Sequence, residues 1–515
     1  LAEEIAPDLY ITCSADLAPK WGEYERTTAV ALNAYIGPIT VGYVTRLDRR
    51  LKDLGYKPPL QITQCAGGTI TVRKSQQAPL LTLDSGPVSG VMGSAYLGGI
   101  MDCPNVITTD LGGTSFDVGV IHKGEPVVSY KSVVHQYEYF LPKVDVQTLG
   151  TGGGSKVWLD KATRSLRVGP ESAGADPGPV CYGKGGTVPT TTDADLVLGY
   201  LDPDNFAGGT MKLDRDAACA ALADLAEELA MSLYELASGV ATIAEFQMAD
   251  LIRKVTVQKG LDPRDFVVFA FGGAGPVHMG VAARELGVGK VIVPQGDTAA
   301  VWCAFGAASA DILHVNEQVN IMSSPFDLEH VNAILDELRA RGRKYLLDDG
   351  VEADRHQLRF SIDMRHRGQI NEVEVNLDGG VLDENGLEAL RERFVGRYER
   401  LYGRGASLLG ARLEIVTLRC RASAVSRKPK LVRARELVPD IAADAKTGRR
   451  DIYWAEWKRI ESTPIFDGYK LRPGNAIEGP CVVETMTTSM VVHPGQRIAV
   501  DALGNFVIDP NYQRE

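Results

Sequence analysis

The chain has 515 residues, 44% of them hydrophobic and 23% charged, a composition typical of a soluble globular protein with two or three domains. Its net charge of −11 argues against a general nucleic-acid or anionic-membrane surface. The sequence contains no apolar run of about eighteen residues and no signal-peptide pattern at its start, so no membrane association is expected. The eight cysteines are scattered without a C-x-x-C, which predicts reduced thiols in a cytoplasm.

The first elements are expected to be helical. Residues 23–56 have apolar residues at helical spacing and predict two helices, the second from Gly42 to Leu54. Residues 61–71 predict a strand with a glycine turn. Residues 85–97 predict a helix rich in small residues, which allow close packing.

Residues 106–118 predict a β-hairpin in which an apolar strand reaches an Asp, breaks at two glycines, offers two hydroxyls and resumes. The glycines let the backbone approach an anion, and successive N–H groups and hydroxyls can donate to phosphate oxygens. The Asp can hold Mg²⁺, which prefers oxygen ligands. The alternative is a plain glycine turn, and the hairpin alone does not decide between the two. The tip residues concerned are Asp110, Gly112, Gly113, Thr114 and Ser115.

Residues 149–190 are rich in glycine and proline and predict mostly loop. Apolar residues interleaved with the glycines argue against a disordered linker. Helices are expected from Thr192, over residues 214–231 and over residues 233–260.

A second glycine motif follows these helices. Residues 266–286 predict a strand, a glycine turn and a helix, a topology typical of phosphate or nucleotide contacts. Gly272, Gly273 and Gly275 would let a nucleoside's sugar or α-phosphate lie against the backbone. With the earlier hairpin, this turn gives a two-point signal for a nucleotide site.

The last third of the chain has a different pattern of predicted helices and strands. Helices are expected over residues 327–348 and 383–402, and strands over residues 356–364 and 370–377. From about residue 450, short apolar runs alternate with turns and predict a small β-rich module.

These sequence patterns resemble those of known proteins. The hairpin resembles the phosphate-binding hairpins of the actin, Hsp70 and sugar-kinase superfamily. Nearly the whole chain resembles the hydantoinase A / 5-oxoprolinase family, which includes ATP-dependent acetone and acetophenone carboxylase subunits. The matching stretches are residues 23–28, 85–87, 110–117, 152–155, 168–186, 199–214, 271–278 and 479–484.

The resemblance implies an α/β fold: an actin/Hsp70-like (RNase-H-like) ATPase lobe over residues 24–320 and a C-terminal α+β domain over residues 321–515. Family members usually begin with a further N-terminal lobe that carries its own Asp-x-Gly-Gly-Thr loop, and nothing here matches it. Residues 1–23 look like the trailing edge of that lobe, so we expect the lobe to be missing. Because ATP binds between two lobes in this superfamily, activity is expected to need partner chains, including a hydantoinase B-type subunit.

The resemblance also implies ATP and Mg²⁺ and the phosphorylation of a carbonyl-type oxygen. Residues 67–70, 198–206 and 471–475 look like the ketone-carboxylase branch. We therefore expect a subunit of an acetone- or acetophenone-type carboxylase that uses a ketone and bicarbonate. Two alternatives stay open: a hydantoinase or 5-oxoprolinase subunit that opens a cyclic amide, and a non-catalytic scaffold subunit that keeps an actin-like half-fold.

On this interpretation Asp110 and Thr114 are catalytic, Asp110 through Mg²⁺. The phosphate- and nucleotide-binding residues are Gly112, Gly113, Thr114, Ser115, Gly272, Gly273 and Gly275. Several other polar residues have a simpler structural explanation. We expect Asp117 to stabilise the hairpin turn, His278 to cap a helix or lie buried, Asp193 and Asp195 to cap a helix, and Cys181 and Cys303 to be core thiols.

Overall fold

The computed structural model describes residues 2–6, 9–407 and 410–512 and divides into two compact units. Unit 1 contains residues 1–92, 128–144 and 307–428, and unit 2 contains residues 93–127, 145–306 and 429–515. Each unit is therefore discontinuous in sequence. The expected parts, 1–23, 24–320 and 321–515, are consecutive and differ from this division.

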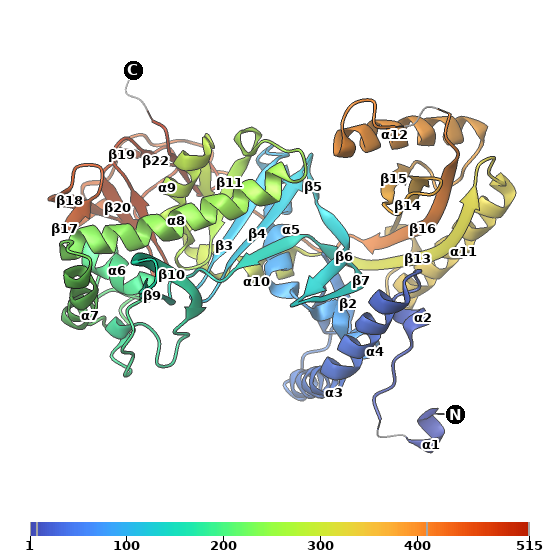
Figure 1. Ribbon diagram of the computed structural model, residues 1–515, viewed down its shortest axis with the longest axis horizontal. Helices are drawn as coiled ribbons and strands as arrows, with labels where there is room; N and C mark the ends of the chain where they lie inside the picture. The colour runs from blue at the N-terminus through green and yellow to red at the C-terminus, as the bar shows by residue number, and fades with distance from the viewer. Residues whose placement is uncertain (1, 7–8, 408–409, 513–515) are drawn as a thin grey trace. The chain divides into compact units, whose positions relative to one another are not determined.

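Unit 1 is built on one mixed sheet in the order β1-β2-β13-β16-β14-β15, with a separate β6–β7 hairpin (Figure 1). Its strands are β1 (Gln61–Thr63), β2 (Thr69–Thr71), β6 (Val128–Val134), β7 (Tyr137–Val144), β13 (Ile312–Ser323), β14 (His356–His366), β15 (Val373–Leu377) and β16 (Leu413–Ala424). Its helices are α1 (Ala2–Ile5), α2 (Ser14–Leu17), α3 (Glu23–Asp53), α4 (Val72–Gln77), the start of α5 (Ser85–Ile100), α11 (Leu328–Asp348) and α12 (Glu384–Tyr402).

The core of unit 1 follows from the periodicity of its helices and strands. Val331, Leu335 and Leu338 lie on one face of α11 and are fully buried against the sheet. A second, smaller cluster packs α3 against β7 and includes Ala29 and Tyr139.

Two expectations for unit 1 are wrong. Residues 23–53 form one helix instead of two, and Pro38 lies inside it. Gly37, next to this proline, allows close packing, because an added Cβ would lie 2.5 Å from the Tyr10 ring. The long strands β13 and β16 were not expected, although they pair with each other at the centre of the sheet.

Unit 2 is built on a second mixed sheet in the order β19-β22-β23-β12-β11-β3-β4-β5, with β8 also paired to β4. The strands of this sheet are β3 (Val106–Leu111), β4 (Phe116–His122), β5 (Glu125–Pro126), β8 (Val146–Leu149), β11 (Val267–Phe271), β12 (Val291–Val293), β19 (Ala476–Glu478), β22 (Arg497–Val500) and β23 (Phe506–Asp509). The helices of unit 2 are the end of α5, α6 (Thr191–Leu198), α7 (Arg215–Glu228), α8 (Leu233–Val257), α9 (Gly275–Leu286) and the start of α10 (Trp302–Ser309).

The centre of this sheet is a hairpin followed by parallel strands. β3 and β4 pair antiparallel, as expected, and β3, β11 and β12 run parallel side by side. Helix α8 packs on β4 and β8, and α9 packs on β11 and β12. This arrangement places the loop after β3 and the loop after β11 at the same edge of the sheet.

Two features of unit 2 were not expected. Residues 149–190 are mostly loop and turn, as expected, but β9 (Ser155–Asp160) and β10 (Ser165–Ser172) form a hairpin within them. The β-rich C-terminal segment is not a separate module: β23 pairs with β12, so it extends the sheet that carries the phosphate-type hairpin. A smaller sheet of β17 (Lys446–Trp454), β18 (Arg459–Asp467), β20 (Cys481–Glu484) and β21 (Ser489–Val492) completes this segment.

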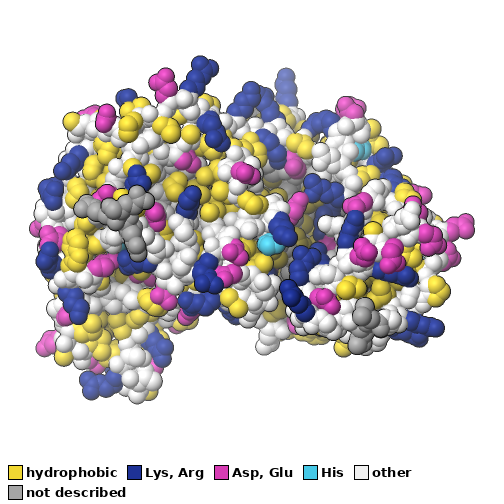
Figure 2. All heavy atoms as spheres, turned by 90° about the horizontal axis from the view of Figure 1, so that it is seen from above, with side chains coloured by type: hydrophobic (Ala, Val, Ile, Leu, Met, Phe, Trp, Pro, Cys, Tyr) yellow, Lys and Arg dark blue, Asp and Glu magenta, His cyan; other side chains and the backbone are white. Residues whose placement is uncertain are grey.

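Basic and acidic side chains are interspersed on the face of the protein shown in Figure 2. Among the described residues, no helix combines the length and the apolar character that crossing a bilayer requires.

Candidate functional site

The hairpin tip and the glycine turn, which are far apart in sequence, lie together in unit 2. In the parallel ladder Phe271 is the register partner of Asp110, so Gly272 follows directly beside the hairpin. A Cβ on Gly272 would lie 2.5 Å from Asp110 Oδ1 and 2.3 Å from the Leu111 carbonyl oxygen. Gly272 also has a φ of 77°, so its backbone conformation and its surroundings both require glycine.

Asp110 is partly buried near the end of β3, with a hydrogen-bond donor and a second carboxylate close to it. Its Oδ2 accepts a hydrogen bond from the Cys303 thiol at 3.1 Å, so Cys303 is not the simple core thiol that we expected. Burial raises the Asp110 pKa above its usual value, the Cys303 hydrogen bond opposes that rise, and the nearby Asp117 carboxylate adds to it. A cation or a hydrogen-bond donor beside Asp110 would therefore favour its charged form.

The tip of the hairpin is accessible and has spare donors. Gly113 and Thr114 are exposed, and within the described residues their backbone N–H groups have no hydrogen-bond partner. Cβ atoms on Gly112 and Gly113 would meet nothing within 4 Å, which leaves room for a ligand over this backbone. The Ser115 hydroxyl instead donates to Asp117 Oδ2 at 3.2 Å.

Asp117 also accepts a hydrogen bond from the Thr148 hydroxyl on β8. Asp117 thus braces the hairpin against its neighbour, as its structural interpretation requires. Cys181 is buried, and its backbone N–H donates to Asp193.

A third glycine loop, residues 150–155, lies on the hairpin tip and was not among the predicted site residues. The N–H of Gly153 donates to the Gly112 carbonyl at 3.0 Å, and the N–H of Gly154 donates to the Gly113 carbonyl at 2.7 Å. A Cβ on Gly152 would lie 2.8 Å from the Gly112 carbonyl oxygen and from the Thr114 nitrogen. The run of glycines in the sequence was a signal for this close approach.

The C-terminal segment also reaches the site. The Thr488 hydroxyl, from the turn between β20 and β21, donates to the Gly273 carbonyl at 2.8 Å. The N–H of Ala274 donates to the Leu111 carbonyl at 3.2 Å, and Gly275 then begins α9. The predicted residues Gly273 and Gly275 therefore lie beside the hairpin, but the contact from Thr488 could not be read from the sequence.

Of the polar residues near α9, Asp193 and His278 agree with an expected role, a helix cap and a buried histidine, and Asp195 does not. Asp193 forms a capping box with Thr190 at the start of α6, as expected. Asp195 is not a cap, because its carboxylate pairs with His278. His278 is not a cap either: it is fully buried between Asp195 and Glu245.

The possible metal ligands at the hairpin suit Mg²⁺ better than a metal ion that is bound by protein side chains alone. Among the residues that the structure describes, no group of three or more His, Cys, Asp or Glu side chains could hold a metal ion. Mg²⁺ commonly binds through one or two carboxylates and completes its shell with water and substrate phosphates. Asp110 beside an open tip can supply such a single carboxylate.

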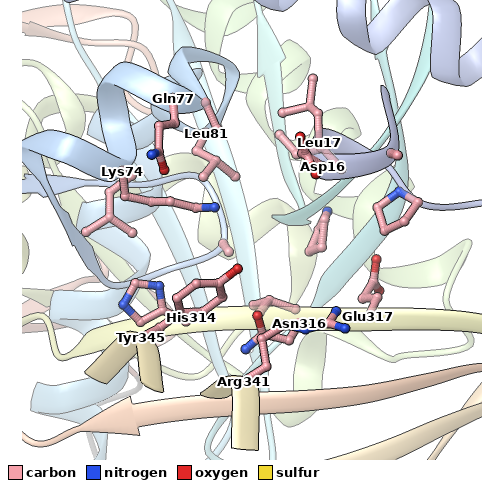
Figure 3. Close-up of a pocket in the computed structure, with 18 of the residues that line it drawn as sticks. Asp16, Leu17, Lys74, Gln77, Leu81, His314, Asn316, Glu317, Arg341 and Tyr345 are labelled. Carbon is pink, nitrogen blue, oxygen red and sulfur yellow. The ribbon is translucent and has the colours of Figure 1, made fainter. Parts of the chain in front are cut away.

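Unit 1 contains a cavity of about 990 Å³ that includes none of the predicted site residues. It lies along β13, with Lys74 of α4 on one side and Arg341 and Tyr345 of α11 on the other (Figure 3). Burial lowers the Lys74 pKa, and Asp16 and Asp349 oppose that change. The cavity is lined by residues of unit 1, whereas the hairpin belongs to unit 2.

Comparison with known proteins gives matches along almost the whole chain. Residues 26–316 match the hydantoinase/oxoprolinase family, and residues 325–507 match the hydantoinase/oxoprolinase C-terminal domain. Caprolactamase subunit alpha of Pseudomonas jessenii is 36% identical, over 98% of this chain and 73% of the relative. The acetophenone carboxylase gamma subunit of Aromatoleum aromaticum is 33% identical, over 97% of this chain and 69% of the relative.

A solved structure supports the same relationship. The crystal structure of the ATP-dependent caprolactamase from Pseudomonas jessenii matches with a TM-score of 0.89 and 35% identity, over 99% of this chain and 74% of that chain. The α/β fold is therefore shared with an ATP-dependent enzyme. By its sequence and its fold, the chain belongs to the hydantoinase/oxoprolinase family.

Proposed function

We propose that this chain binds ATP at the hairpin tip and helps to transfer its γ-phosphoryl group to a carbonyl-type oxygen. The observation that carries this proposal is the meeting of Asp110 with Gly272 at the shared edge of β3 and β11. The strand order β5-β4-β3-β11-β12 has the form expected of an RNase-H-like, actin-type lobe. Glycine loops at the ends of adjacent strands are a common support for phosphates.

Several of the predicted residues have positions that support a role. The N–H groups of Gly113 and Thr114 can donate to phosphate oxygens. Gly272 lets the turn pack against Asp110, and Gly273 leaves room over the backbone for the nucleoside side. Asp110 would hold Mg²⁺, which neutralises phosphate charge when it is bound. The reaction breaks the bond between the γ-phosphorus and the oxygen that leaves with ADP, and forms a bond to the substrate oxygen.

Phosphorylation of this kind solves one chemical problem for two substrate classes. For a lactam, phosphate on the amide oxygen makes the ring carbon more reactive toward water and turns a poor leaving group into a good one. For a ketone, phosphate on the enolate oxygen holds the enol form, and the O–P bond breaks when the new carbon–carbon bond forms, so that the ketone oxygen is kept. The protein therefore needs to position phosphates and neutralise charge, and it needs no covalent nucleophile. This agrees with Cys181 being buried in the protein.

The substrate is either a ketone with bicarbonate or a cyclic amide. The sequence analysis favoured an acetone- or acetophenone-type carboxylase. The caprolactamase alpha subunit, however, is more similar to this chain than the acetophenone carboxylase gamma subunit is, at 36% against 33% identity. We therefore propose ATP-dependent opening of a lactam as an equal candidate.

Both relatives are named as subunits, which supports partner chains for this protein. We propose that a second subunit, of the hydantoinase B type, supplies the chemistry that follows phosphorylation. The scaffold alternative keeps the same partner and removes ATP binding, so a nucleotide-binding measurement separates it from the catalytic proposal.

The test measures ATP hydrolysis by the protein purified with its co-expressed neighbours. Two substrate sets are compared: a ketone with bicarbonate, and lactams with 5-oxoproline. Asp110→Asn should lower stimulated hydrolysis at least tenfold without unfolding the protein, because the amide lacks the carboxylate's charge. Asp204→Asn, an exposed aspartate of the same unit, is the matched control and should leave the rate unchanged.

Hydrolysis stimulated by one set identifies the substrate class. A folded Asp110→Asn protein with wild-type turnover would remove Asp110 from the mechanism. Failure of the assembled protein to bind ATP would leave the scaffold role.

A further inference from the structure

A buried charged triad lies beneath the glycine loops of unit 2. His278 of α9 is fully buried, with Nε2 at 3.2 Å from Asp195 Oδ2 and Nδ1 at 3.3 Å from Glu245 Oε1. Asp195 belongs to α6 and Glu245 to α8, and their exposed fractions are 3% and 4%. The imidazole therefore joins three helices through both of its nitrogens.

Each of the three helices also holds one of the loops at the candidate site. On α6, both the backbone N–H and the hydroxyl of Thr192 donate to the Gly153 carbonyl at 2.8 Å. On α8, Gln247 Oε1 accepts a hydrogen bond from the Thr151 hydroxyl at 2.7 Å. Helix α9 begins at Gly275, directly after the turn that abuts Asp110.

The charges of the triad make its geometry hard to relax. Burial lowers the His278 pKa, but Asp195 and Glu245 outweigh this effect and raise the pKa to about 10. The imidazolium thus stands between two buried carboxylates at neutral pH. Removing it would leave two buried carboxylates without the cation between them, which is strongly unfavourable. Asp195 Oδ1 has no hydrogen-bond partner among the described residues, so the hydrogen bond of this carboxylate to a side chain is the one from His278 to Oδ2.

We propose that His278 is a positioning residue for the nucleotide site: with Asp195 and Glu245 it fixes α6, α8 and α9 so that the loops at residues 150–155 and 272–275 meet the hairpin tip. This inference rests on the proposed ATP-binding function. His278 lies beneath the loops and touches neither Asp110 nor the hairpin tip, so it acts through the backbone that it supports. A site built from glycine has few side chains of its own to hold it, which makes such support from below necessary.

The first experiment measures ATP affinity by titration calorimetry on the purified assembly. His278→Gln should weaken binding at least tenfold, because two unpaired carboxylates would push the helices apart. Asp195→Asn should have a smaller effect, since the imidazolium keeps Glu245 as a partner. His314→Gln is the matched control: it removes another buried His–Asp pair, His314 with Asp349 at 2.6 Å in unit 1, and should leave the affinity unchanged.

The second experiment needs no nucleotide. Hydrogen exchange of residues 150–155 and 272–275 should be faster in His278→Gln than in the wild type, while exchange of α11 stays the same. If His278→Gln does not fold, the double variant His278→Gln/Glu245→Gln keeps the net charge of the triad and should show the same local acceleration. These two regions are the readout that separates positioning from general stability.

The outcomes distinguish the positioning role of His278 from the proposed ATP-binding function. Wild-type affinity and wild-type exchange in a folded His278→Gln protein would overturn the positioning role. No ATP binding by the wild-type assembly, together with faster loop exchange in His278→Gln, would overturn the proposed function and leave the structural coupling standing. Equal loss of affinity in His278→Gln and His314→Gln would also overturn the inference, because the effect would then not be specific to the triad.

Discussion

Replacing Gly272 by alanine should destabilise unit 2 far more than the same change at the next residue. The added Cβ would lie 2.3 Å from the Leu111 carbonyl oxygen and 2.5 Å from Asp110 Oδ1, both closer than atoms can approach. The φ of 77° adds about 1–2 kcal/mol of backbone strain for an L-residue. Relief of the overlap adds about 1–3 kcal/mol, as for other overpacked sites. The expected loss is therefore about 2–5 kcal/mol in the free energy of unfolding.

The measurement is urea unfolding monitored by circular dichroism, with Gly273→Ala and Gly112→Ala as matched controls. At Gly273 the nearest atom to an added Cβ is 3.8 Å away, and at Gly112 nothing lies within 4 Å. Neither control has a positive φ, so each should change stability by about 1 kcal/mol or less. If Gly272→Ala is no more destabilising than Gly273→Ala, the close approach of the glycine turn to Asp110 is refuted.

Three further predictions concern pH, the core of unit 1 and assembly. The pKa of His278 is raised from 6.5 to about 10 in the folded protein, so its contribution to stability is complete below pH 6.5 and is lost as the pH rises through 10. The difference in the free energy of unfolding between wild type and His278→Gln should therefore shrink between pH 6.5 and 10. A constant difference would contradict the assignment of a positive charge to His278. Arg419→Met should lower the free energy of unfolding by about 3–5 kcal/mol, because the fully buried guanidinium pairs with three acidic side chains that would lose their partner. Arg393→Met, at an exposed ion pair, is the control and should lower it by about 1 kcal/mol or less. Light scattering should show a larger hetero-oligomer when the chain is co-expressed with its neighbours, and a stable monomer that is fully active alone would argue against the partner proposal.

The parts of the fold that were predicted correctly depend on short-range patterns. In the hairpin over residues 106–122, both strands and the glycine tip lie close together in sequence, so the pattern of apolar residues and the turn glycines were enough to predict it. The strand, glycine turn and helix at residues 267–286 are equally local, and their boundaries agree with the structure. The capping role of Asp193 could be predicted for the same reason, since its partner Thr190 is three residues away.

The parts that were missed depend on distant partners. Strands β13 and β16 pair across about a hundred residues, and buried polar residues such as Glu317 and Arg419 hide their alternation. Their polarity is explained by the ion pair between these two side chains at 2.6 Å. His278 was expected to cap a helix or lie buried, but nothing nearby in sequence shows that two carboxylates from other helices surround it.

The pairing of β23 with β12 has a consequence for how this protein is made. About 200 residues separate Val293 from Phe506, its partner in the ladder. At translation rates of roughly 5–20 residues per second, the sheet that carries the hairpin would stand with β12 as an open edge for about 10–40 seconds before its last strand emerges. Thr488, which holds Gly273, appears almost as late. A nascent chain therefore holds an unpaired strand edge and an unsupported glycine turn while about 200 residues are made, which makes chaperone capture during translation more important for this fold than for one whose sheet closes early.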